Sequence, residues 1–188
     1  MQYINSYRKN KMPEFKTRKQ IRLPNYDYSE GGYYFVTVCS KNRENLFGNS
    51  VGALLACARE LSICGQIIER QWLDLPNQYD DVELDEYVIM PNHIHGILIL
   101  NNRSPAGLRA QASSAPTISQ IIRSFKSRSS MEYLKFINEN NLNVSGKIWQ
   151  RSFYDHVIRN ERSLNAIRQY ILDNPLNWEQ DIENLLNL

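Results

Sequence analysis

The spacing of apolar residues changes along the chain, and three of the strand-like stretches lie within the first 100 residues. β-branched and aromatic residues fill positions 33–39, which predicts a strand. Apolar residues alternate with acidic and polar ones over 80–90, and a nearly continuous apolar run follows over 93–100. Pro91 and Asn92 between them are typical of a turn. We therefore expect the second and third strands to pair as an antiparallel hairpin.

Helical spacing appears in two places before the last third of the chain. Ile68, Trp72 and Leu75 predict a helix within the otherwise mixed stretch 51–75, in which 60–64 is a possible short strand. Thr117 is a good N-cap for an amphipathic helix that follows it.

The last third of the chain combines one more strand with one more helix. Residues 148–158 are aromatic and rich in β-formers, which predicts a strand. Asn160 is a good N-cap for a final amphipathic helix with Leu164, Ile167 and Ile171 inward, and Asn174-Pro175 ends it.

The order of these elements indicates an α+β fold. We expect a ferredoxin-like antiparallel sheet with helices packed mainly on one face. Residues 1–28 show no sustained period and form a predicted basic N-terminal arm, followed by one domain over 29–178. Within that domain, 101–116 is small, polar and interrupted by proline, which predicts a flexible loop. Residues 179–188 are a predicted short C-terminal tail.

Composition narrows the class of protein. The chain has 188 residues, and its longest apolar run, 51–58, is far shorter than a bilayer span of about 20 residues. The first residues lack the apolar core of a secretion signal. Cys39, Cys57 and Cys64 are an odd number without a C-x-x-C pair, which favours reduced thiols. We expect a cytoplasmic protein with no membrane partner.

Charge is strongly segregated. Residues 1–22 carry seven Lys or Arg and one acid, residues 74–86 carry six acids and no base, and residues 101–130 carry five bases and no acid. Basic tracts interleaved with aromatic residues suit contact with nucleic-acid phosphates and unstacked bases. The alternative is that these tracts are simply solvated surface.

His93 and His95 are the first candidates for chemistry. On a strand, residues i and i+2 point to the same face, so two imidazoles can converge on one cation. A polar outer face is the alternative interpretation. The apolar run that follows favours the metal, because it indicates a central, buried strand on which polar groups need partners.

Tyr170 and Asn174 are the second candidates. They lie one helical turn apart, on a face beside the apolar stripe of the last helix. Taken alone, Tyr170 is typical of a core-edge side chain and Asn174 of a helix C-cap. His156 is open between a third metal ligand, a phosphate donor and a structural histidine held by Asp155.

Several blocks in order carry a family resemblance. They are 21–29, 34–39, Asn42-Arg43, 88–97 (VIMPNHIHGI), 149–160 (WQRSFYDHVIRN) and 170–176 (YILDNPL). Together they resemble the single-tyrosine HUH transposases, and most of all the branch of REP-associated tyrosine transposases. The likeness runs from about residue 20 to 178, with 101–116 unmatched.

The resemblance implies a ferredoxin-like enzyme that acts on single-stranded DNA beside a hairpin. It implies Tyr170 as the nucleophile, with His93, His95 and Asn174 holding a divalent metal, Mg²⁺ or Mn²⁺. Many relatives carry Gln where this chain has the shorter Asn174. The predicted activity is metal-dependent cleavage and strand transfer through a 5′-phosphotyrosine. The alternatives are a domesticated module that binds structured single-stranded DNA or RNA without cutting, and a phosphoesterase that uses activated water. Intact His93, His95 and Tyr170 favour the transposase.

The same interpretation assigns the DNA contacts. Basic residues grip the backbone and aromatic residues offer stacking faces. The predicted contacts are Arg22, Tyr26, Tyr28, Arg43, Arg123, Lys126, Arg128, Trp149, Arg151, His156 and Arg159. A monomer and a homodimer are both compatible with the sequence. When bound to DNA, the protein is expected to associate with the nucleoid.

Overall fold

The computed structural model describes residues 31–48, 60–101, 116–181 and 183. The predicted arm at 1–28 lies outside the described residues, and so does almost all of the predicted loop at 101–116. No helix in the described part of the chain is long and apolar enough to cross a bilayer.

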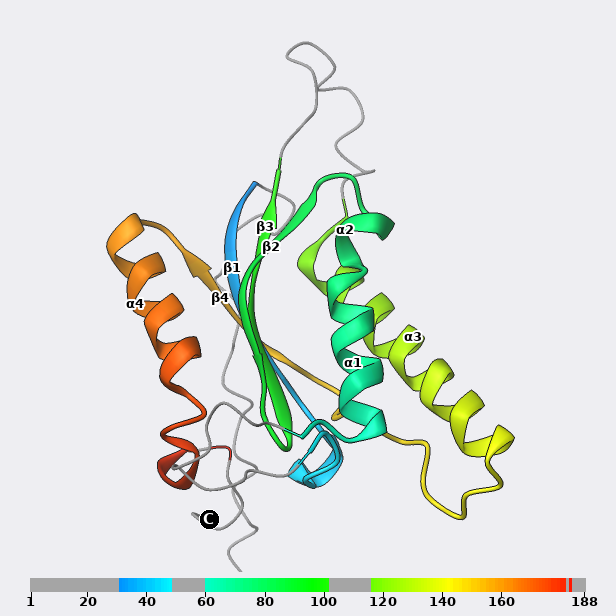
Figure 1. The fold of residues 1–188 in the computed structure, drawn as a ribbon. Coiled ribbons are helices and arrows are strands. Elements are labelled where there is room, and N and C mark those ends of the chain that lie inside the picture. The colour runs from blue at the N-terminus through cyan, green and yellow to red at the C-terminus, as the bar shows by residue number, and fades with distance from the viewer. Residues whose placement is uncertain (1–30, 49–59, 102–115, 182, 184–188) are drawn as a thin grey trace, which may run out of the picture.

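Four antiparallel strands form one sheet (Figure 1). They are β1 (Gly32–Cys39), β2 (Val82–Ile89), β3 (His93–Leu100) and β4 (Tyr154–Ile158). Their order across the sheet is β2-β3-β1-β4, which is the ferredoxin-like order and confirms the predicted fold class. The two central strands, β1 and β3, are the ones with the longest apolar runs. The predicted β2–β3 hairpin is present.

Helices cover both faces of this sheet. Helices α1 (Ile63–Leu73), α2 (Leu75–Gln78) and α3 (Ile118–Glu139) lie on one face, and α4 (Glu161–Asp173) lies on the other (Figure 1). The predicted caps are confirmed, since Thr117 caps α3 in a capping box with Gln120 and the Asn160 side chain accepts from Ser163 N. Short 3₁₀ turns follow β1, at Lys41–Arg43 (η1), and α4, at Trp178–Gln180 (η4).

Strand β3 contributes to two separate cores because its alternate residues face opposite ways. Ile94 and Leu98 join the larger core with Trp72 and Phe125 from the helices α1 and α3. Ile97 joins the smaller core beneath α4. Strand β3 is therefore buried on both faces, as the apolar run over 93–100 predicted. This burial favours a metal site over a polar outer face for His93 and His95.

Two predicted strands differ from the structure. Over 148–158 only Tyr154–Ile158 is a strand, because the first half leaves the sheet after a single bridge from Trp149 to Ser40. Ile148 and Gln150 bond the backbone at the end of β1, and the ammonium of Lys126 holds the carbonyls of Gln150 and Ser152 at 2.9 Å each.

The possible strand at 60–64 is likewise a single bridge, from Leu61 to Gly48. Helix α1 begins at once at Ile63, because the Ser62 hydroxyl accepts from Gly65 N and caps it.

Candidate active site

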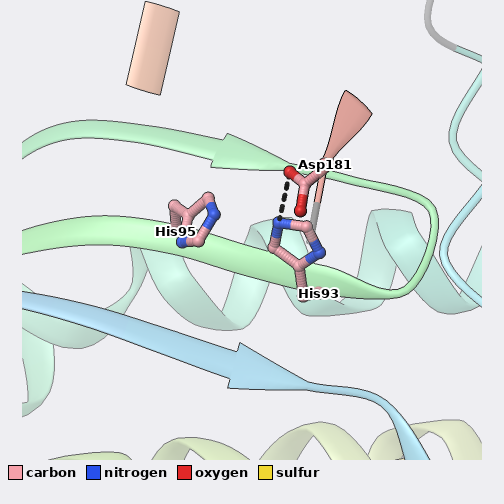
Figure 2. Close-up of side chains that lie close together, drawn as sticks. All are labelled: His93, His95 and Asp181. Atoms are coloured by element: carbon pink, nitrogen blue, oxygen red, sulfur yellow. Dashed lines mark ion pairs between the residues drawn. The ribbon is translucent and has the colours of Figure 1, made fainter. Parts of the chain in front are cut away.

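Strand β3 presents two histidines on the face covered by α4. The rings of His93 and His95 are buried, with centroids 4.3 Å apart (Figure 2). Ile94 between them is buried in the opposite core. The same-face placement predicted from the i, i+2 spacing is therefore present in the structure.

Each histidine is held through its Nδ1 atom. Asn92 Oδ1 lies 2.8 Å from His93 Nδ1, and the amide of Asn92 donates to the carbonyls of Arg43 and Glu183. These two donated bonds fix the side-chain oxygen of Asn92 toward the ring, so His93 Nδ1 carries the proton and Nε2 keeps its lone pair. The Thr37 hydroxyl lies 2.9 Å from Nδ1 of His95. Such outer bonds are what orient metal-binding imidazoles.

The electrostatics of this site keep both rings uncharged. Burial, reinforced by the nearby Arg43 guanidinium, lowers the pKa of His93 to about 3. Burial also brings the pKa of His95 well below its usual value, and the proximity of His93 adds to this. A neutral imidazole is the form that binds a metal.

Asp181 completes a group of three. It follows η4 and places a carboxylate beside His93, with Oδ2 3.9 Å from His93 Nε2 (Figure 2). One ligand atom from each of His93, His95 and Asp181 lies within 4.8 Å of the other two. Trp178 is buried with its ring centroid 6.1 Å from that of His93, and it anchors the turn that carries Asp181.

Asp181 was not predicted as a ligand, because 179–188 was expected to be a tail. It is one of three acids after the last helix, with Glu179 and Glu183, and no motif distinguishes it from the other two. The buried-looking Trp178 three residues earlier is the one signal that this segment returns to the core.

Helix α4 brings Tyr170 to the same place. The Tyr170 hydroxyl lies 3.3 Å from His95 Nε2, and the side chain is 44% exposed. Burial on its inner side raises the pKa of Tyr170, and the carboxylates of Asp181 and Glu183 add to this, while a hydrogen bond from Asn174 opposes it. The hydroxyl is thus protonated at neutral pH, close to the buried histidines, and still open to a substrate.

Asn174 is the C-cap residue of α4, is buried, and forms a side-chain hydrogen bond with Tyr170. Its side-chain Oδ1, like His93 Nε2, has no hydrogen-bond partner among the described residues. Buried polar atoms rarely lack partners, so both atoms fit the ligand shell of a cation. Two imidazole nitrogens, a carboxylate and an amide oxygen form a donor set suited to a divalent metal.

The predicted DNA contacts divide into three groups. Arg22, Tyr26 and Tyr28 lie outside the described residues. Four side chains are exposed on the described surface: Arg123, Arg151, His156 and Arg159. The other four have partners within the protein: Arg43 pairs with Glu183, Lys126 binds two carbonyls, Arg128 pairs with Asp74, and Trp149 packs against Phe47 and Phe125.

His156 and Tyr154 share the sheet face with the histidines. His156 lies on edge strand β4 and is not part of the group formed by His93, His95 and Asp181. Tyr154 is 47% exposed, and the Phe35 ring lies between it and Tyr170, with centroid distances of 6.4 and 6.1 Å. Tyr170 is therefore the tyrosine in contact with a histidine, and Tyr154 is its neighbour across Phe35.

Comparison with known proteins places a chain with this fold and site among the transposases. The family model described as "Transposase IS200 like" matches residues 28–174, so the chain belongs to this family. It is 37% identical over 174 residues to an uncharacterised protein of Haemophilus influenzae, covering 87% of this chain and 91% of that one.

Two solved structures are similar to this chain. One is a REP-associated tyrosine transposase bound to a REP hairpin, with a TM-score of 0.51 and 23% identity over 84% of this chain and 74% of that chain. The other is a putative transposase from Deinococcus radiodurans, with a TM-score of 0.45 and 16% identity over 81% of this chain and 95% of that chain. The first supports the architecture described above.

Proposed function

We propose that this transposase is a metal-dependent endonuclease and strand transferase for single-stranded DNA beside a hairpin, and that it acts through a 5′-phosphotyrosine on Tyr170. The observation that carries the proposal is the Tyr170 hydroxyl 3.3 Å from His95 Nε2, at the edge of the group formed by His93, His95 and Asp181. The solved relative bound to a REP hairpin supports the choice of substrate.

The three buried ligands would hold the metal, with the amide of Asn174 as a fourth candidate. A bound divalent cation, Mg²⁺ or Mn²⁺, would neutralise the charge of the scissile phosphate, which otherwise repels a nucleophile. His93 and His95 arrive in this role already neutral and oriented by Asn92 and Thr37, so little reorganisation is needed.

Tyr170 would perform the substitution. Its oxygen bonds to phosphorus as the bond from phosphorus to the 3′ oxygen breaks, and that oxygen leaves as a 3′-hydroxyl. The linkage keeps the energy of the broken bond, so a 3′-hydroxyl can attack it and rejoin the strand without a nucleotide cofactor. Buried Leu164 and Ile171 hold α4 on the sheet, which limits the movement of the nucleophile.

The test uses a hairpin with a single-stranded tail and Mn²⁺. In a 5′-phosphotyrosine, the protein stays joined to the fragment that carries the 3′ end. A 3′ label should therefore shift with the protein on a denaturing gel, while a 5′ label should appear on a shorter free strand. Chelation of the metal and Tyr170→Phe should each remove the shift, and Tyr154→Phe should keep it.

Other outcomes would identify the alternatives. Binding of the hairpin without any cut indicates the non-cleaving module. Cutting without a denaturation-resistant adduct indicates activated water as the nucleophile. Cytoplasmic location and association with the nucleoid stay predictions, as does the choice between monomer and homodimer.

A further inference from the structure

The side chain of Asn174 contacts the tyrosine of the candidate active site. Asn174 is the C-cap residue of α4, is 3% exposed, and lies about one helical turn after Tyr170. Its side chain forms a hydrogen bond with Tyr170 that acts to lower the pKa of the phenol. A bond with this effect favours the charged form of an acid, so the amide N–H donates and the Tyr170 oxygen accepts. The end of α4 therefore supplies both a hydroxyl and a donor to it.

The two polar atoms of the Asn174 amide have different surroundings. Its Oδ1 has no hydrogen-bond partner among the described residues, whereas its Nδ2 is not one of the buried atoms that lack a partner. An amide nitrogen only donates and an amide oxygen only accepts, and this difference assigns the two ends. The bond to Tyr170 therefore engages the nitrogen end of the amide.

His95 is the second polar contact of the Tyr170 hydroxyl. Its Nε2 lies 3.3 Å from the hydroxyl oxygen, and its Nδ1 lies 2.9 Å from the Thr37 hydroxyl. In the neutral tautomer that binds a metal through Nε2, Nδ1 carries the proton and donates to Thr37. The Nε2 lone pair then accepts from the Tyr170 hydroxyl. The hydroxyl is thus held from two sides, by a donor on α4 and an acceptor on β3.

A metal bound by the histidines would remove one of these two bonds. Nε2 has a single lone pair, which His95 cannot give to a cation and to the Tyr170 hydroxyl at the same time. The ring contacts of Tyr170, with centroids 6.1 Å from Phe35 and 5.3 Å from His95, orient the phenol without fixing its oxygen. With 44% of the side chain exposed, packing alone leaves the hydroxyl room to swing. The bond from the Asn174 amide is the one that remains.

The metal site does not depend on Asn174 for its third ligand. His93, His95 and Asp181 form a complete group of three, with one ligand atom from each within 4.8 Å of the others. The nitrogen end of Asn174 can therefore serve the nucleophile without weakening the hold on the metal.

We propose that Asn174 is a positioning residue for the nucleophile: its amide N–H holds the Tyr170 oxygen in place while His95 gives its Nε2 lone pair to a metal. The inference rests on the proposed function, which makes Tyr170 the nucleophile. It goes beyond that function in two respects. Asn174 acts through its nitrogen, and the Tyr170 hydroxyl competes with the metal for one lone pair.

The competition is tested by metal affinity in the absence of DNA. Tyr170→Phe removes the competing hydroxyl, and Tyr154→Phe, the matched control, removes a hydroxyl from a similarly exposed ring. Titration of free Mn²⁺ followed by electron paramagnetic resonance should show about two- to tenfold tighter binding in Tyr170→Phe, the equivalent of one hydrogen bond, and no change in the control. Unchanged or weaker binding in Tyr170→Phe would overturn the proposal.

The role of the amide nitrogen is tested with Asn174→Asp, which keeps the shape and the oxygen but, when ionised, has no hydrogen to donate. Asn138→Asp adds the same charge at an exposed position of α3 and is the matched control, while Asn174→Gln retains the donor. Each chain carries ¹³C at Cζ of its tyrosines, and the Tyr170 signal is assigned by its absence in Tyr170→Phe. In saturating Mg²⁺, that signal should move or broaden in Asn174→Asp, stay in place in Asn138→Asp, and return toward its natural position in Asn174→Gln.

The rate of adduct formation with a tailed hairpin is the second readout, measured at saturating Mn²⁺ and DNA. Asn174→Asp should slow the adduct about 100-fold, the cost of misplacing a reacting group by about 1 Å, although its Mn²⁺ affinity is no lower than that of the natural chain. Asn174→Gln should recover part of the loss. An unchanged Tyr170 signal or an unchanged rate in Asn174→Asp would overturn the proposal and leave Asn174 acting through its oxygen. A natural chain that forms no adduct would contradict the proposed function, and the signal in Mg²⁺ would still decide whether Asn174 positions Tyr170.

Discussion

At the scale of single residues, the proposed metal site would depend on its third protein ligand. The Asp181 carboxylate contributes a negative charge to two neutral imidazoles, whereas Asn174 contributes only a dipole. We expect Asp181→Asn to weaken Mn²⁺ affinity at least about tenfold, the loss common even for outer partners of a ligand, and Asn174→Ala to weaken it less. Titration of free Mn²⁺ followed by electron paramagnetic resonance measures both. The reverse order would make Asn174 the principal ligand.

Thr37 contacts the proposed metal ligand His95 and should affect how tightly the metal binds. Its hydroxyl bonds His95 Nδ1 at 2.9 Å and orients the ring. Thr37→Val keeps the shape and removes the bond, so we expect Mn²⁺ affinity to fall about 10-fold with little change in the melting temperature of the metal-free chain. Thr37→Ser retains the hydroxyl and should restore affinity. Unchanged affinity in the valine variant would show that packing alone holds His95.

The sequence predicted part of this site for physical reasons that are easy to state. The histidine pair follows from the two-residue period of a strand, and the position of Tyr170 beside it follows from an amphipathic helix plus family resemblance. Asp181 follows from neither, because its place depends on how the chain folds back after α4 and buries Trp178. That return is a tertiary event with no local period.

At the scale of elements, a pair of charges ties the tyrosine helix to the sheet. Arg168 on α4 donates to both carboxylate oxygens of Asp85, which lies at an irregularity of β2. These bonds lower the pKa of Asp85 below its ordinary value. Arg168 lies two residues before Tyr170 on α4, so its contact with Asp85 helps to fix the helix that carries Tyr170.

Because the pKa of Asp85 is lowered, the sign of the pH dependence of folding stability can be worked out. A carboxyl whose pKa is lower in the folded state stabilises it above the ordinary pKa, and the stabilisation is lost as the pH falls through the lowered pKa. We expect Asp85→Asn to be less stable than the natural chain at pH 7, and the difference to shrink below about pH 3.8. Urea unfolding at several pH values measures it. A difference that stays constant with pH would mean that the bridge contributes nothing through charge.

Gly96 sets how closely α1 approaches β3. A Cβ at this position would overlap the ring of buried Trp72. We expect Gly96→Ala to lower the free energy of unfolding by about 1–3 kcal/mol, the usual cost of overpacking. Trp72→Phe, with its smaller ring, should recover part of that loss in the double variant. Full stability of Gly96→Ala would show that the ring has room to shift.

The elements themselves were largely predictable because hydrophobic period and caps agree in most of them. Residues 148–153 are the larger of two exceptions, the other being 60–64. Their aromatic, β-prone side chains resemble a strand, but Ile148 and Trp149 pack into the core between α3 and η1 instead of joining the sheet. The β-propensity of residues 148–153 favours a strand, but tertiary packing overrides it.

At the scale of the whole molecule, the sheet separates two kinds of surface. The α4 face carries His93, His95, Asp181 and Tyr170. The α3 side carries a hollow lined by Lys41, Lys126, Lys147 and Arg151. The uneven charge along the sequence indicated nucleic-acid binding, but the partition needs the fold, since Lys41 and Lys147 are far apart in the chain and line the same hollow.

The central claim is that Tyr170 itself becomes joined to DNA. The most direct measurement is mass spectrometry of peptides from the protein after reaction with a tailed hairpin and Mn²⁺, followed by nuclease digestion. We predict a nucleotide 5′-phosphate on the peptide that contains Tyr170, and its absence in Tyr170→Phe or after chelation of the metal. The same modification on the Tyr154 peptide, or cleaved DNA with no modified peptide, would contradict the account.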